Sequence, residues 1–472
     1  MKKIITMFAV LFMVMATVVY AQGPTPGTGN TTVYVTNTDS AGPASVTADY
    51  INPNGNTDFT DFANVPYAGQ AVFQGSTASL PPSWSGAMVL SSDRVVAAAA
   101  VTEWTGGATG GGKWDGITAG AYTGFPGGAT QVYAPSIFKR SYQSSKITVQ
   151  NTDTVTATVT VEFYTRGQST PVHTVNAQIP PGASKTFDVW DYPQIPTADP
   201  TEGPDTWKGA ARVVSAQKVA VVVTTHWNWG SSIYSGVSQP STTLYVPSIF
   251  KKKYANWRIY SGLIIMNPNN QDAQLTFYFY NRDGTLAIPP VQKTISAFSS
   301  DGFNTRYSPD VFGTVSNDWN GLAVITSTVP VVGIVNNIWR KPTQETASYA
   351  MGTADDAATK LYYPVLFRKY TGSWEQWSAA IFQNTTDTDA TVTARFYNPD
   401  GTLAATAGPI TIPGKGAKGL NTRYDSDPGE PLASLPADWT GVAVVESDQP
   451  IIGISNLIWT DKAAGYNAAV VQ

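Results

Sequence analysis

The chain has 472 residues, more than one ordinary domain needs, and it contains no cysteine, so its domains are held together by packing without disulfides. Charged residues make up only 13% of the chain and aromatic residues 12%, a balance typical of an exported all-β protein. The formal net charge of −4 argues against a nucleic-acid partner.

The first residues have the layout of a secretory signal peptide. Lys2 and Lys3 precede an apolar run over residues 4–19, and the small residue Ala21 follows as a cleavage point. We expect residues 1–21 to be removed, which changes the net charge from −4 to −6 through the loss of two lysines. The alternative is an uncleaved membrane anchor, because the run is about long enough to cross a bilayer. No later segment approaches that length, so we expect no transmembrane segment in the mature chain.

Four copies of one pattern follow, and we assign them to residues 22–132, 133–244, 245–360 and 361–472. Each copy opens with an apolar strand that ends in an Asn turn, and its second strand ends in a tight turn. These turns close on Gly55, Gly167, Gly284 and Gly401. Glycine tolerates the positive φ that short hairpin connections need, so the four positions predict hairpins.

Each copy also contains two tryptophans, the first in a Trp-x-Gly motif and the second 20 residues later. Burying one indole removes about 200 Å² from water and contributes roughly 5 kcal/mol at about 25 cal/mol per Å². We interpret the eight rings as core anchors, with a sugar-stacking ladder as the alternative. They are Trp84, Trp104, Trp207, Trp227, Trp319, Trp339, Trp439 and Trp459.

The fold class follows from the strand pattern. Each copy has some seven short strands with regular turns and no convincing amphipathic helix. We therefore predict an all-β protein of four tandem antiparallel two-sheet β-sandwich domains with immunoglobulin-like architecture.

A repeated phrase begins copies two to four. It reads YAPSIFKR at 133–140, YVPSIFKKKY at 245–254 and YYPVLFRKY at 362–370. We assign it to the first strand of the copy that follows, with its proline at a sheet edge or a strand start. Because this leaves no room for a flexible linker, we expect a semi-rigid row of four domains about 150 Å long.

The order of these motifs resembles a tandem repeat of secreted bacterial surface or extracellular-matrix proteins. The resemblance rests on Tyr-x-Pro-x-x-Phe, VQN, IPPG at Ile179–Gly182, Trp-x-Gly and YSGVS at Tyr234–Ser238. It implies an immunoglobulin-like sandwich and a place at the cell surface, and it implies no catalytic residues. The first copy departs most, since it lacks the leading phrase.

That departure suggests a mode of self-association. The first copy has an unfilled edge, and the chain ends in a short apolar strand at 466–472. One hypothesis is head-to-tail polymerisation by strand addition, with Tyr466, Ala468, Val470 and Val471 as subunit contacts. The alternative is that this strand belongs to its own domain.

Basic residues recur after each leading phrase. A row of cations could contact an anionic glycan, and the alternative is protection of a sheet edge. The candidate anion contacts are Lys139, Arg140, Lys251, Lys252, Lys253, Arg368 and Lys369.

Residues for catalysis or metal binding are sparse. His173 and His226 do not recur between copies. Three acidic stretches have Ca²⁺ binding or a solvated turn as alternatives: Asp355-Asp356, Asp387–Asp389 and Asp425–Glu430. We expect no enzyme activity, no cofactor and no metal. Six tryptophans outside the repeat could bind sugars or line domain contacts: Trp114, Trp190, Trp229, Trp257, Trp374 and Trp377.

Taken together, these features predict a secreted, non-enzymatic structural protein of the cell surface or of an extracellular filament, sheath or matrix. The second hypothesis is an adhesin or carbohydrate-binding surface protein. The expected partners are a second copy of the chain or a cell-surface glycan.

Overall fold

The computed structural model of the chain describes residues 8–14, 25–75, 79–81, 83–108, 118–199, 202–253, 256–340, 344–423 and 432–471. Regular structure in these ranges is nearly all β-strand, as the sequence predicts. The helical pieces are α1 (Pro309–Phe312) and the 3₁₀ turns η1 (Val189–Asp191), η2 (Ala354–Asp356) and η3 (Leu432–Ser434). None of the helices in the described ranges is long and apolar enough to cross a bilayer.

The strands fall into four consecutive groups, which we call units 1 to 4. Unit 1 contains β1 (Phe8–Val14), β2 (Thr25–Asn37), β3 (Ala44–Ile51), β4 (Thr57–Val65), β5 (Gln70–Gln74), β6 (Gly86–Ser92), β7 (Val96–Ala108) and β8 (Thr118–Thr123). Unit 2 contains β9 (Ala129–Arg140), β10 (Gln143–Asn151), β11 (Ala157–Thr165), β12 (Pro171–Ile179), β13 (Ser184–Asp188), β14 (Lys208–Trp227) and β15 (Gly230–Ser235).

The last two groups have the same layout as unit 2. Unit 3 contains β16 (Ser241–Lys253), β17 (Trp257–Met266), β18 (Ala273–Asn281), β19 (Val291–Ile295), β20 (Ser300–Asn304), β21 (Asp318–Arg340) and β22 (Gln344–Ala350). Unit 4 contains β23 (Ala358–Tyr370), β24 (Trp374–Asn384), β25 (Ala390–Tyr397), β26 (Leu403–Ile412), β27 (Ala417–Asn421), β28 (Asp438–Trp459) and β29 (Ala463–Asn467).

One long strand organises each of units 2 to 4. In unit 2 the strand order is β12-β11-β14-β9-β10-β13, with β15 beside β14. The first half of β14 pairs with β9 and β11, and its second half pairs with β10 and β15. Because β14 belongs both to the part of the sheet with β9 and β11 and to the part with β10 and β15, the sheet curls around a core. In unit 1 the two parts are separate sheets, β1-β6-β3-β4 and β5-β2-β7-β8.

The Trp-x-Gly motif is an indole folded back over a glycine. A Cβ atom on Gly209 would lie 2.1 Å from the carbonyl oxygen of Tyr164 and 2.8 Å from the Trp207 ring. The ring is fixed by its Nε1, which donates a hydrogen bond to Thr165 Oγ1 at 2.9 Å. The same crowding occurs at Gly86, Gly321 and Gly441. Glycine is therefore required because the indole and a neighbouring strand occupy the space of a side chain.

The paired tryptophans have different places in the fold. Trp84 is half-buried, whereas the other seven indoles are at most 7% exposed. Some of the second tryptophans lie at boundaries between units. Trp104 of unit 1 shares a core with Val222 and Ile233 of unit 2, and Trp459 of unit 4 shares one with Val101 of unit 1.

The proline of each leading phrase lies at a bulge inside its strand. In β9 the register shifts between Ala134, opposite Ala211, and Ile137, opposite Gly209. Register shifts also occur around the proline of β16 and of β23. A bulge accommodates a residue without an N–H group, so the prolines need neither the sheet edge nor the strand start that the sequence suggested.

Neighbouring units touch through paired turns. The glycine turn of each unit lies against a turn of the next unit, and its glycine has a φ between 77° and 85°. The contacts across the four boundaries are Gly55 against Pro180, Gly167 N–H to Ser299 Oγ (2.9 Å), Ala417 N–H to the Arg282 carbonyl (3.0 Å) and Gln70 N–H to the Pro399 carbonyl (2.9 Å). The turns that the sequence marks as hairpins are therefore also the contacts between units.

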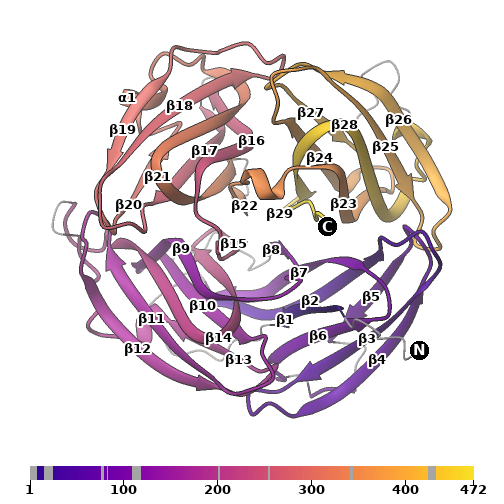
Figure 1. The fold of residues 1–472 in the computed structure, drawn as a ribbon, viewed down its shortest axis with the longest axis horizontal. Helices are drawn as coiled ribbons and strands as arrows, with labels where there is room; N and C mark the ends of the chain where they lie inside the picture. The colour runs from indigo at the N-terminus through magenta and orange to yellow at the C-terminus, as the bar shows by residue number, and fades with distance from the viewer. Residues whose placement is uncertain are drawn as a thin grey trace, which may run out of the picture.

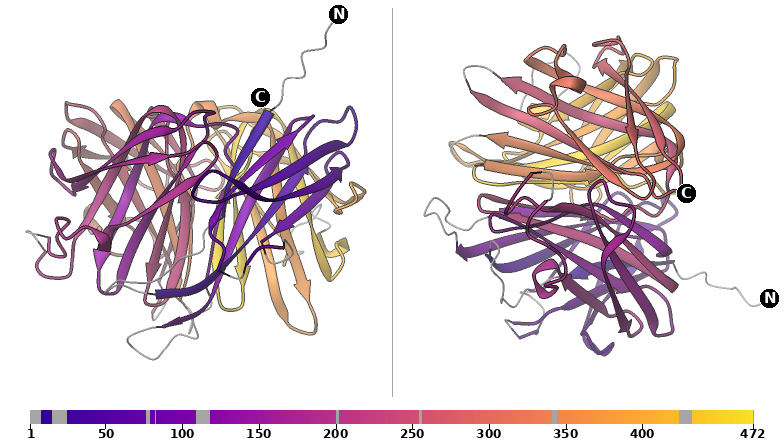
Figure 2. Two further views of the ribbon diagram at one scale, coloured as in Figure 1. Left: turned by 90° about the horizontal axis from the view of Figure 1, so that it is seen from below. Right: turned by 90° about the vertical axis from the view of Figure 1, so that its left-hand side faces the viewer.

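The fourth of these contacts closes a ring. Gln70 Nε2 of unit 1 donates to the Pro364 carbonyl of unit 4 at 2.6 Å, and the Tyr362 hydroxyl donates to the Thr38 carbonyl at 3.1 Å. Figure 1 shows the four units following one another around this ring, and Figure 2 shows them side by side from two further directions. The extended row of about 150 Å that short junctions predict is wrong, because a short junction also permits a sharp turn between units.

The last strand of every unit lies at the centre of the ring. Strands β8, β15, β22 and β29 each contact the two neighbouring strands of the set (Figure 1). Small residues permit this approach: a Cβ atom on Gly120 would lie 2.5 Å from Ile233, and one on Gly465 would lie 3.0 Å from Ala347. The four strands therefore form a packed central column.

We expect Gly209→Ala to lower the free energy of unfolding by roughly 1–3 kcal/mol, because the methyl group would overlap the Tyr164 carbonyl. Chemical denaturation measures this change. Gly127→Ala is the matched control, since a Cβ atom there has no neighbour within 4 Å. Equal stability of the two variants would contradict the proposed role of the motif.

We expect small-angle X-ray scattering to give a radius of gyration of about 23 Å, the value for a compact chain of this length. A straight row of four domains would give roughly 40 Å, estimated from its length of about 150 Å. The larger value would show that units 1 and 4 do not meet in solution.

The burial of His226 predicts that the boundary between units 1 and 2 is sensitive to acid. Its side chain is 1% exposed, its Nδ1 lies 2.7 Å from Ser231 Oγ, and its ring meets Trp104 edge-on. Burial lowers the pKa of His226 to about 3. Below pH 6.5 the unfolded chain binds a proton that the folded chain does not, so the histidine's contribution to stability is present above pH 6.5 and declines as the pH falls towards 3.

We therefore expect the free energy of unfolding of the wild type to fall faster with decreasing pH than that of His226→Gln. The difference in slope is about 1.4 kcal/mol per pH unit between pH 6 and pH 4. Urea denaturation at a series of pH values measures both slopes, and parallel curves would contradict the assignment.

Candidate functional site

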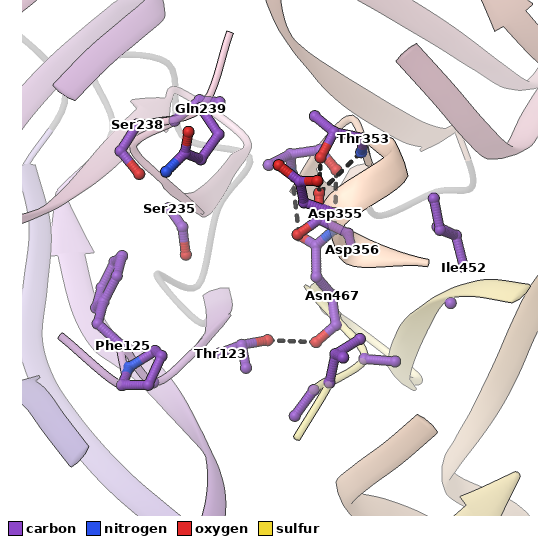
Figure 3. A pocket seen from close by; sticks show the side chains of 18 of the residues that line it. Thr123, Phe125, Ser235, Ser238, Gln239, Thr353, Asp355, Asp356, Ile452 and Asn467 are labelled. Atoms are coloured by element: carbon purple, nitrogen blue, oxygen red, sulfur yellow. Dashed lines mark hydrogen bonds between the residues drawn. The ribbon is translucent and has the colours of Figure 1, made fainter. Parts of the chain in front are cut away.

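A cavity of about 570 Å³ lies where the chain leaves the central column. Its walls are the ends of β8, β15, β22 and β29 and the segments that follow them (Figure 3), together with Val95 and Val96 before and at the start of β7 and Ile452 and Gly453 within β28. Each unit contributes one of the four segments. The cavity therefore depends on closure of the ring, and no single unit contains it.

We call this cavity the axial pocket. Hydrogen bonds between units fix the position of the residues at its base. The Asn467 side chain of unit 4 accepts from Ala350 N–H at 3.1 Å and donates to the Ala350 carbonyl at 2.9 Å. Thr123 Oγ1 of unit 1 donates to the Asn467 carbonyl oxygen. These contacts join units 1, 3 and 4 at one point, so this part of the lining is fixed by the fold itself.

Polar side chains line the wall formed by units 2 and 3. Ser238 and Gln239 of unit 2 lie on one side, and Asp355 and Asp356 of unit 3 lie across from them (Figure 3). Asp356 Oδ2 accepts from Thr353 N–H at 2.8 Å and from Thr353 Oγ1 at 2.9 Å, which anchors the acidic turn. Within the described ranges, Asp355 has no ion-pair partner. This wall presents hydroxyl, amide and carboxylate groups to the cavity.

Most of the remaining lining is apolar, apart from Ser235. Phe125 and Pro126 of unit 1 and Val470 and Val471 of unit 4 contribute it. Asp355 and Asp356 are the charged residues of the lining, so the pocket carries negative charge on one side and an aromatic ring on another. Such a surface favours a ligand with hydrogen-bond donors and an apolar face, and it disfavours an anion.

Sequence reasoning singled out only part of this pocket. Val470, Val471 and Asp355-Asp356 were candidates for other roles, whereas Phe125, Ser238 and Gln239 were missed. One signal was available in the sequence. A tyrosine recurs near the end of the last strand in all four units, at Tyr122, Tyr234, Tyr349 and Tyr466, and the residues after it differ in every unit.

The predicted anion contacts have internal roles. Lys139 Nζ donates to the carbonyls of Tyr192 and Ile195 at 2.8 Å, and Lys251 Nζ donates to two carbonyls at 2.6 Å. Burial lowers the pKa of both lysines. Each ammonium group is buried and donates to two carbonyls, so the structure gives these two lysines an internal role in place of the predicted contact with an anionic polymer.

The other cations of the clusters also have partners within their own unit. Arg140 donates to the Thr206 carbonyl at 2.7 Å, and Arg368 donates to the Leu435 carbonyl at 3.1 Å. Lys252 pairs with Asp318 and Lys369 with Asp438. Lys253 is exposed at the end of β16. The clusters therefore tie the first strand to the segment that leads into the long strand.

The C-terminal strand is paired inside its own unit. Tyr466 is 1% exposed and lies opposite Ser455 of β28, and its hydroxyl donates to the Val365 carbonyl at 2.5 Å. Ala468 N–H donates to the Gly453 carbonyl at 2.9 Å. Together with the pocket residues Val470 and Val471, these residues lie within the ring. The hypothesis that they add to a second molecule is therefore wrong for the folded chain.

Tryptophans outside the repeat also contact other parts of the protein. Lys139 Nζ lies 5.3 Å from the Trp190 ring, Trp229 stacks on Trp227, and Arg423 lies 4.5 Å from the Trp377 ring. Arg368 lies over Trp374 at 5.2 Å. Trp114 and the side chain of Trp257 are outside the described residues.

Comparisons with known proteins give no family. No protein-family model matches the chain, and no curated protein matches it. Among solved structures, Thermotoga maritima 1070 is similar over 24% of this chain and 96% of its own, with 16% identity and a TM-score of 0.21. The Anabaena sensory rhodopsin transducer is similar over 21% of this chain and 96% of its own, with 20% identity and a TM-score of 0.17.

Proposed function

We propose that the protein is a secreted, non-enzymatic surface protein that binds a carbohydrate in the axial pocket. Its four units act as immunoglobulin-like sandwich domains that together form one binding site. The observation that carries this proposal is the convergence of four differing segments on one cavity of about 570 Å³. A volume of this size is within the range of pockets that enclose small molecules.

The lining chemistry supports a sugar. Hydroxyl groups of a sugar donate hydrogen bonds to carboxylates such as Asp355, and they both donate to and accept from Ser238 and Gln239. The apolar face of a sugar ring packs against an aromatic ring such as Phe125. The carboxylates repel acidic sugars, so the favoured ligand is a neutral sugar or an amino sugar.

The differences between the four segments support a ligand without symmetry. Four identical segments would surround the axis with four equal sets of groups. Here unit 1 offers a phenyl ring and a proline, unit 2 hydroxyl and amide groups, and unit 3 two carboxylates. A ligand with one polar and one apolar side satisfies all three walls at once.

A structural role as a building block of a surface layer or filament is the second candidate. It is favoured by the edge position of β1, since β1 is the outer strand of its sheet and belongs to the predicted leader. Without it, the edge of β6 would be open to another strand.

We expect isothermal titration calorimetry with a set of neutral, amino and acidic oligosaccharides to detect binding of a neutral or amino sugar. Asp355→Asn should weaken this binding roughly tenfold to a hundredfold, the range for loss of a hydrogen bond to a charged group. Ser238→Trp should abolish it by filling the cavity.

Asp272→Asn is the matched control, because Asp272 is an exposed carboxylate of the same unit outside the pocket lining. Failure of every sugar class to bind, or equal binding by Ser238→Trp, would contradict the proposal.

A further inference from the structure

Strand β1 lies along one side of unit 1, antiparallel to β6. The register runs from Phe8 opposite Ser92 to Val14 opposite Gly86 without interruption. In the sheet order β1-β6-β3-β4, β6 has β3 on its other side. Removal of β1 would therefore leave the backbone groups of Gly86–Ser92 without partners on one edge.

The same place is filled in the other units by the leading phrase. In unit 2, β9 lies antiparallel along the first half of β14, with Ile137 opposite Gly209. Gly209 and Gly86 are the glycines of their Trp-x-Gly motifs, so Val14 and Ile137 occupy equivalent positions. β16 and β23 have the same relation to Gly321 and Gly441. Each unit thus needs a strand here to complete its sheet.

The source of that strand differs in unit 1. In units 2, 3 and 4 this strand is β9, β16 or β23, which lies in the interior of the chain, so cleavage of an N-terminal leader does not remove it. Unit 1 takes it from residues 8–14, which fall inside the segment that the sequence identifies as a secretory leader. Export with removal of residues 1–21 would take away the strand that completes the sheet.

We propose that the β6 edge of unit 1 is a strand-acceptor site in the exported protein. It takes an extended, alternately apolar segment from a second polypeptide, antiparallel to β6, in the place of Phe8–Val14. This inference rests on the export that we propose above, and it is independent of sugar binding in the axial pocket.

An added strand would bind to β6 because unpaired backbone groups at a sheet edge beside a core cost free energy. Met88 and Leu90 of β6 are fully buried and belong to the core of unit 1. Loss of the neighbouring strand leaves unpaired N–H and C=O groups beside this core, which an added strand satisfies at once. Seven residues of pairing, as in β1, match the length of an ordinary strand.

The incoming strand comes from a different protein. Every strand in the described ranges of this chain is already paired in its own sheet, including the C-terminal β29. A second folded copy therefore offers no free strand from these ranges. The chemistry of the partner is set by the strands that fill the equivalent places, which are apolar and extended, as in YAPSIFKR at 133–140.

The test uses the protein as the cell exports it, with its N-terminus determined by mass spectrometry. The probe is a fluorescent peptide of sequence YAPSIFKR, which fills this place in unit 2 and is made soluble by its two cations. We expect saturable binding by fluorescence anisotropy. We also expect hydrogen exchange of the Gly86–Ser92 amides to slow by roughly tenfold or more when the peptide binds.

Two controls isolate the site. The chain that retains residues 1–21 should not bind the peptide, because β1 occupies the edge. A peptide carrying Ala134→Pro and Ile137→Pro should not bind to the exported protein, because each proline removes a backbone donor.

Three results would overturn the inference: an exported protein that retains residues 8–14, an exported protein in which the β6 amides that face away from β3 are protected without peptide, or absence of peptide binding. Sugar binding is measured on the same preparation. Its loss with intact peptide binding would contradict only the pocket assignment, and the converse would contradict only the acceptor site.

Discussion

The architecture depends on one contact that is repeated at every boundary between units. A hairpin turn with a glycine at positive φ lies against a turn of the next unit, and the geometry is similar enough at all four boundaries for the fourth to return to the first unit. The glycines have two roles in these turns. They permit the backbone conformation, and at Gly55, Gly284 and Gly401 the absence of a side chain permits the close approach of the neighbouring unit.

Closure of the ring creates features that no unit has alone. The central column buries small residues of four strands against one another, and the axial pocket forms where those strands end. Because the units belong to one polypeptide, the four segments around the pocket can differ in sequence while their scaffold stays alike. The result is a cavity with an aromatic wall from Phe125 and an acidic wall from Asp355 and Asp356.

The leading phrase has the sequence pattern of a surface segment, but its first lysine is buried in units 2 and 3. Its cations follow an apolar strand, which in an isolated strand indicates a solvated turn. In the fold, a segment leading into the long strand covers this place, and its carbonyl groups surround Lys139 Nζ and Lys251 Nζ. Its proline lies at a bulge, and the next carbonyl accepts a hydrogen bond from a tyrosine of the last strand, as Ser136 does from Tyr234 at 2.8 Å. The phrase therefore recurs because each copy uses all of its parts in the same internal contacts.

The sequence by itself determined the all-β class, the repeated pattern, the turns at Gly55, Gly167, Gly284 and Gly401, and the constant spacing of the paired tryptophans. These features are local, since alternation of apolar residues and the positive φ of glycine act within a few residues. Only the tertiary structure decided that the row bends into a ring, that Lys139 is buried, and that Ser238, Gln239 and Asp355 face one cavity. Those outcomes depend on contacts between residues about fifty to more than three hundred positions apart, and no periodicity along the chain records such contacts.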